Sequence, residues 1–167
     1  MVRPHAVIDS WKTIRRDSIQ ALLDMPADSL AFQPTPDLMP FADIARHILI
    51  AGHGLAGLLL DGVDNLAVPE FRQMIGKYAP EIPTDAGADV IAAKMGEVME
   101  ADAAALSAQP ESFFGGMMTR FDGLQVTRLE MLQFVKEHEL THRSQMFMYL
   151  RLKGVVPPTT RRKLAKK

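Results

Sequence analysis

The histidines are the residues of this sequence best suited to chemistry, because the chain contains no cysteine. Without thiolates, the protein can build neither a zinc ribbon nor an iron–sulfur cluster nor a disulfide framework. Any metal ion must therefore be held by histidine nitrogens and by oxygen ligands. The candidate nitrogen ligands are His5, His47, His53, His138 and His142.

Two histidines near the end of the chain have the spacing of metal ligands. His138 and His142 are four residues apart on a predicted helix, so they lie about 40° apart around its axis and one turn along it. Imidazoles on an inward-facing stripe are costly to bury unless each ring finds a partner. A shared metal ion would satisfy both rings, and so would hydrogen bonds within the core.

His47, on an earlier predicted helix, could complete such a site. It adjoins the apolar stripe of Ile44 and Ile48, so it can face the axis of a helical bundle, where metal sites are built from facing helices. Asp43 lies one turn before His47 and is a candidate acceptor for its free N–H group. His53 is six residues from His47 and points elsewhere, so we expect it at the surface or in an interface.

Residues 138–142 also match the H-E-x-x-H pattern of zinc proteases, with Glu139 in the place of the general base. Those enzymes take a third ligand from further along the chain, but no Asp, Glu or His follows His142. The longer H-E-x-x-H-x-x-G-x-x-H pattern is absent too. We therefore interpret Glu139 as an incidental match and expect the third ligand to come from upstream.

The elements that must position these residues are helices. Apolar residues recur at helical spacing in four long segments, at about 8–24, 41–61, 85–108 and 124–153. A short helix is predicted near residues 71–78 and a loop with a small hairpin over 109–123, while four prolines make residues 25–40 an extended connection. We predict an all-α protein: a four-helix up-and-down bundle with a short accessory helix and a proline-rich connection.

Length and composition favour a single domain. The chain has 167 residues, of which 47% are hydrophobic and 23% charged, which suits a globular domain and excludes intrinsic disorder. The formal net charge is -1, but residues 161–167 hold five of the 19 basic residues and no acid. We expect one bundle domain over residues 1–160, followed by a mobile basic tail over residues 161–167.

The same observations set expectations for partners and location. The acidic remainder of the chain argues against a nucleic-acid partner. The longest apolar stretch, residues 48–60, is too short to span a membrane, and no signal peptide or lipidation motif opens the chain. We therefore expect a cytoplasmic protein with neither a nucleic-acid nor a membrane partner.

Two segments resemble motifs of the DinB-like (DinB/YfiT) family of metalloenzymes. Asp43-Ile44-Ala45-Arg46-His47-Ile48, after the proline-rich connection, is similar to the family's second-helix motif. The run H-E-L-T-H-R-S-Q from His138, followed by Tyr-Leu-Arg and a glycine–proline exit, resembles its last-helix signature. The resemblance implies a four-helix bundle, usually a homodimer, in which His47, His138 and His142 bind a divalent metal such as zinc or nickel.

The resemblance also implies a metal-dependent transferase or hydrolase that acts on a small molecule. Some relatives use low-molecular-weight thiols, and here any such thiol must be a substrate or cofactor, because the chain has no cysteine. Relatives commonly carry an acid soon after the second-helix histidine, but residues 49–54 contain none. The alternative is therefore a non-enzymatic bundle, a stress-response or partner-binding protein with a structural or vestigial metal site.

Three further residues are candidates for the surroundings of the metal. Arg143 could meet an anionic substrate or form a plain surface or dimer salt bridge. Gln145 and Tyr149 lie near the same helix face and could line a pocket, with packing in the core as the alternative.

Overall fold

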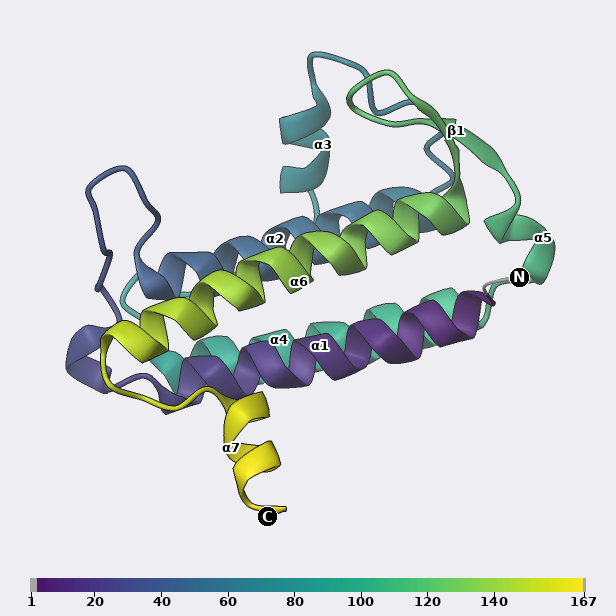
Figure 1. The fold of residues 1–167 in the computed structure, drawn as a ribbon. Coiled ribbons are helices and arrows are strands. Elements are labelled where there is room, and N and C mark those ends of the chain that lie inside the picture. Colours follow the sequence, from purple (N-terminus) through teal and green to yellow (C-terminus); the bar gives the residue numbers. More distant parts are fainter. Residues whose placement is uncertain (1–2, 167) are drawn as a thin grey trace.

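The structure is a computed structural model that describes residues 3–166 (Figure 1). The helices and strands, in chain order, are α1 (Pro4–Asp24), the 3-10 turn η1 (Ala27–Ser29), α2 (Phe41–Leu60), α3 (Phe71–Gly76), α4 (Ala88–Ser107), α5 (Glu111–Phe114), β1 (Met117–Thr119), β2 (Gln125–Thr127), α6 (Arg128–Leu152) and α7 (Pro158–Leu164). The prediction of an all-α protein is confirmed, since the one sheet among these residues has two short strands.

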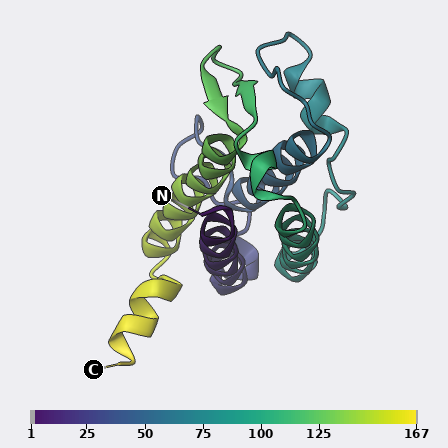
Figure 2. The same ribbon diagram turned by 90° about the vertical axis from the view of Figure 1, so that its right-hand side faces the viewer.

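Four long helices form the bundle. α1 packs against α4 and α6, and α2 packs against the same two helices, so α1 and α2 lie on a diagonal (Figures 1 and 2). Their apolar faces meet in the core, where the Trp11 side chain is fully buried. This arrangement makes α2 and α6 neighbours, which is what a site shared by their histidines requires.

The chain departs from the predicted up-and-down order at one connection. Arg46, near the start of α2, donates to the Ala86 carbonyl just before α4, and His53 further along α2 contacts Asp102 of α4. α2 and α4 therefore run in the same direction. The connection over residues 61–87 makes this order possible, because it is long enough to return along a helix of about 30 Å.

The hairpin and the start of α6 follow from local sequence. β1 pairs antiparallel with β2, and Gly123 supplies the positive φ of 84° that their turn needs. The Thr127 hydroxyl accepts from the Glu130 N–H, and the Glu130 carboxylate accepts from the Thr127 N–H, so the two residues form a capping box. α6 consequently begins at Arg128, after the hairpin.

Glycines in α2 let the accessory helix lie directly on its backbone. A Cβ added at Gly54 would lie 2.5 Å from Cγ2 of Ile75 and 3.0 Å from the Ile75 carbonyl oxygen. At Gly57 it would lie 2.4 Å from the Tyr78 ring. These glycines therefore serve close packing within one chain.

We predict that Gly54→Ala lowers the free energy of unfolding by about 1–3 kcal/mol, because the backbone of α3 must shift to admit the methyl group. The matched control is Gly96→Ala in α4, where the nearest atom is 3.9 Å from an added Cβ. There the gain in helix propensity should raise stability by up to about 1 kcal/mol. Denaturant unfolding measures both changes, and equal stability of the two variants would contradict the packing described.

α2 is long and apolar enough to cross a membrane by length and composition alone, yet 67% of its most apolar stretch is buried inside the bundle. Packing against α4 and α6 accounts for that composition.

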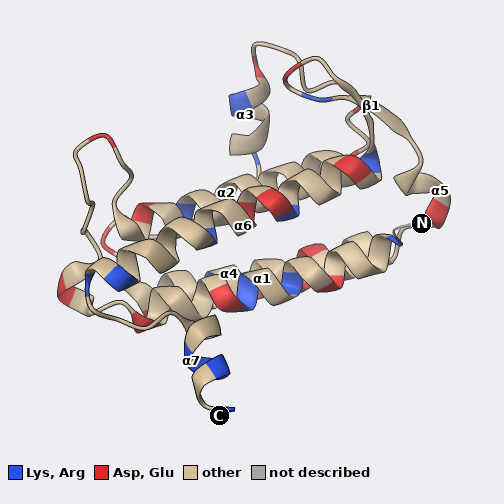
Figure 3. Ribbon diagram, viewed as in Figure 1, with Lys and Arg blue, Asp and Glu red and all other residues tan. Residues whose placement is uncertain are grey.

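The predicted boundary at residue 160 falls inside α7. Residues 161–164 are helical, and Figure 3 shows basic residues along this helix. Arg161 forms an ion pair with Asp24 at 2.8 Å, and Arg162 forms one with Asp17 at 2.8 Å. Two arginines of the predicted tail, Arg161 and Arg162, therefore contact α1 through charge pairs that composition did not reveal. Lys167 lies outside the described residues.

Candidate metal centre

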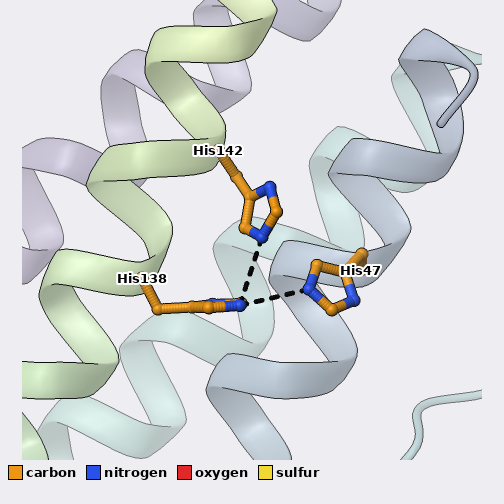
Figure 4. A group of neighbouring side chains, drawn as sticks. All are labelled: His47, His138 and His142. Atoms are coloured by element: carbon orange, nitrogen blue, oxygen red, sulfur yellow. Dashed lines mark hydrogen bonds between the residues drawn. The ribbon is translucent and has the colours of Figure 1, made fainter. Parts of the chain in front are cut away.

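Three predicted histidines meet at the seam between α2 and α6 (Figure 4). The Nε2 atom of His138 lies 3.2 Å from that of His47 and 3.1 Å from that of His142. One ring nitrogen from each residue falls within a span of 4.8 Å, and all three side chains are half-buried. Four-residue spacing aligns two rings on α6, and the neighbouring α2 supplies the third.

The donor set fits a divalent ion. Ligand atoms about 2.0–2.1 Å from a tetrahedral zinc ion lie about 3.3–3.4 Å from one another, which is close to the separations seen here. Imidazole nitrogen suits zinc and nickel alike.

Electrostatics favours the neutral form of His138 and His47. Burial, followed by the nearby rings of His142 and His47, lowers the pKa of His138 to about 4. Burial, and then His142, also lowers the pKa of His47. Metal binding requires unprotonated imidazole, so both rings are ready to bind at neutral pH.

The pKa of His138 gives the metal-free protein a predictable pH dependence. Its pKa in the folded state lies below the ordinary 6.5, so the unfolded chain binds the proton more tightly. Stability should therefore fall as the pH drops from 6.5 toward 4. Thermal unfolding of chelator-treated protein should show a weaker fall for His138→Gln, while a variant of the exposed His5, His5→Gln, should follow the wild type. Identical pH profiles for all three would contradict this account.

Gln145 contacts the site directly. The Nδ1–H group of His142 donates to Oε1 of Gln145 at 2.7 Å. Because an amide oxygen only accepts, this bond places the proton on Nδ1 and leaves the Nε2 lone pair facing the other rings.

The other candidates near the site face elsewhere. Asp43 is exposed in the first turn of α2, and the hydrogen bonds found among the described residues include none from it to the histidines. Arg143 pairs with Asp17 of α1 at 3.4 Å, so it forms a salt bridge within the chain. The Tyr149 hydroxyl donates to the Met39 carbonyl at 3.2 Å and thereby fastens the proline-rich connection to α6.

Glu139 points toward α1, whereas the histidines of α6 point toward α2. It accepts hydrogen bonds from Nε1 of Trp11 at 2.6 Å and from Nε and Nη2 of Arg15 at 2.8 and 2.9 Å. Both charged side chains are 1% exposed. A carboxylate held in this way cannot serve as the general base of a zinc protease, so the H-E-x-x-H match is incidental to that chemistry.

The structural role of Glu139 was not predicted from the sequence. One signal was present: Arg15 falls on the inward stripe of α1, where a charge needs a buried partner.

His53 belongs to a separate pair on another face of α2. Its Nδ1 lies 2.7 Å from Oδ1 of Asp102, whose pKa is raised by burial against the opposing effect of His53. Its side chain is 27% exposed, so the expected surface residue is a partly buried link between α2 and α4. His5 lies exposed on α1.

Comparison with known proteins agrees with the fold. The model of the DinB family matches residues 1–166, so the chain belongs to the DinB family. Among solved structures it is similar to YjoA, a DinB-like protein from Bacillus subtilis, with 21% identity and a TM-score of 0.69 over 89% of this chain and 92% of that one. At this identity the likeness concerns the fold. No match was found among curated proteins.

Proposed function

We propose that His47, His138 and His142 together bind one divalent metal ion, with zinc or nickel as the expected metals. The observation that carries the proposal is the convergence of three imidazole nitrogens within 4.8 Å. The neutral state of His138 and His47 at physiological pH supports it. Membership of the DinB family, which is associated with metals, agrees with it.

We further propose that the protein is an enzyme acting on a small molecule. Structural zinc sites usually have four protein ligands, whereas catalytic sites have three and keep a position open. The three histidines are only half-buried, so they are not sealed from solvent. A divalent ion there supplies Lewis acidity, which lowers the pKa of water or of a thiol. Thiol transfer and hydrolysis both fit this chemistry, and a thiol would come from outside, since the chain has no cysteine.

The protein's own residues prepare the site. Gln145 fixes the tautomer of His142, and the Glu139–Arg15 pair fastens α6 to α1. Both contacts hold the rings in place before a substrate arrives.

Elemental analysis of tag-free protein purified without added metal tests the binding proposal. We expect close to one equivalent of a transition metal per chain, or a clear rise in thermal stability when zinc or nickel is added to the metal-free protein. Less than about a tenth of an equivalent, together with no rise in stability, would overturn it.

Activity assays test the second proposal. Metal-loaded protein is given an electrophile with a low-molecular-weight thiol in one arm and an activated ester without thiol in the other. A metal-dependent rate in either arm supports an enzyme and separates transfer from hydrolysis. Equal rates for loaded and metal-free protein in both arms would favour the non-enzymatic alternative.

We also propose a cytoplasmic homodimer, on the basis of the family resemblance. Light scattering should give twice the 18.5 kDa of one chain, and the mass of a single chain would contradict the dimer.

A further inference from the structure

A row of aromatic rings from three separate elements ends at the histidine cluster. The ring of Phe71, on α3, stacks on that of Phe121, in the hairpin turn, with centroids 5.3 Å apart. Phe121 meets Phe134 of α6 at 5.3 Å, and Phe134 lies 6.2 Å from the ring of His138. Phe134 precedes His138 by one helical turn and so lies on the same face of α6.

The row of rings lies where a small molecule bound to the metal could contact it. α3 and the hairpin stand beside α2 and α6 on the side away from α1 and α4 (Figures 1 and 2). Phe121 is 39% exposed, and Phe71 and Phe134 are only partly buried. Exposed phenyl rings gain free energy when another apolar or aromatic group covers them.

The cation that lies against the row is already paired with an acid. The Arg120 guanidinium lies 5.8 Å from the ring centre of Phe121 and 5.3 Å from that of Phe134. Its Nε donates to Asp122 at 2.9 Å, so the cation is paired. This contact holds the two rings in position, and Asp122 neutralises the cation that lies against them. The row therefore favours an uncharged group.

We propose that Phe134 and Phe121 form the substrate-binding wall of the metal site and select substrates with an uncharged aromatic or planar apolar group. The atom of such a substrate that reaches the metal would lie at the histidine cluster, with its ring along the wall. This inference rests on the proposed function, since it needs a metal ion with an open position.

Two small chelators that differ in one group test the wall. Benzohydroxamate and acetohydroxamate bind metals through the same hydroxamate and differ only in phenyl against methyl. Their dissociation constants are measured by calorimetry on zinc-loaded protein whose zinc content is checked before and after. We expect benzohydroxamate to bind about tenfold more tightly to the wild type, and Phe134→Leu to reduce this preference to about threefold or less.

Two variants complete the test. Phe121→Ala removes an exposed ring that is separated from His138 by Phe134, so it should keep zinc and acetohydroxamate binding and still weaken the phenyl preference. Leu124→Ala is the matched control, because Leu124 is a 55% exposed apolar side chain of the same hairpin outside the row. It should retain the wild-type preference.

The outcomes are distinct. The proposed substrate-binding wall would be wrong if the wild type bound the two hydroxamates equally tightly. It would also be wrong if both phenylalanine variants kept the wild-type preference for benzohydroxamate. Zinc-loaded protein that binds neither hydroxamate would also overturn it and leave metal binding intact. Wild-type protein that holds no zinc before any hydroxamate is added would overturn the proposed function itself.

Discussion

A chain carrying His138→Ala will bind zinc more than about a hundredfold more weakly than the wild type. This loss exceeds the 10–100-fold that is usual when a residue that hydrogen-bonds to a metal ligand is replaced. The reason is geometric, because His138 is the ring whose Nε2 lies within 3.2 Å of the nitrogens of both other histidines. Competition with a chromophoric chelator measures the affinity.

The matched control for this prediction is His53→Ala. His53 is also a half-buried histidine of the bundle, but it pairs with Asp102 on another face of α2. Zinc affinity should stay within about twofold of the wild type, a difference well below 1 kcal/mol. Equal losses in the two variants would mean that zinc binds without preference for the proposed site.

Replacing Glu139 with alanine will lower the free energy of unfolding by about 3–5 kcal/mol. The substitution leaves the guanidinium of Arg15 buried without its carboxylate and removes the acceptor of the Trp11 indole N–H. An uncompensated buried charge is among the largest single costs known in folded proteins. Guanidinium unfolding followed by circular dichroism measures the loss.

Two further variants test the physical reason. Glu137→Ala removes an exposed acid from the same helix and should change stability by less than about 0.5 kcal/mol. Arg15→Met combined with Glu139→Leu removes both charges and should cost less than Glu139→Ala alone. The free energy lost in the double variant could instead equal the sum of the losses in Arg15→Met and Glu139→Leu measured singly. That result would show that Arg15 and Glu139 do not act as a pair.

Helical periodicity predicted most of the fold, because each long helix presents an apolar stripe to the core. The first and last residues of the helices were less predictable. α1 begins at Pro4, several residues before its apolar pattern, since proline is well tolerated in a first turn. α6 begins later than its pattern, because β2 takes up residues 125–127. The direction of α4 could not be predicted, since periodicity does not distinguish the two ends of a helix.

The candidate site was predictable in part for the same reason. Spacing on one helix placed His138 beside His142, and Gln145 three residues further on lies within reach of His142. The partner of Glu139 was not predictable, because Arg15 is 124 residues away in sequence and meets it only when α1 packs against α6.

X-ray absorption at the zinc edge tests the central claim most directly. We expect three imidazole nitrogens about 2.0–2.1 Å from zinc in the wild type, together with one or more oxygen ligands from solvent. In His138→Ala protein that retains any zinc, the number of imidazoles should fall to two. A zinc ion surrounded by oxygen ligands alone in the wild type, without the scattering pattern of imidazole rings, would contradict the assignment of His47, His138 and His142 as its ligands.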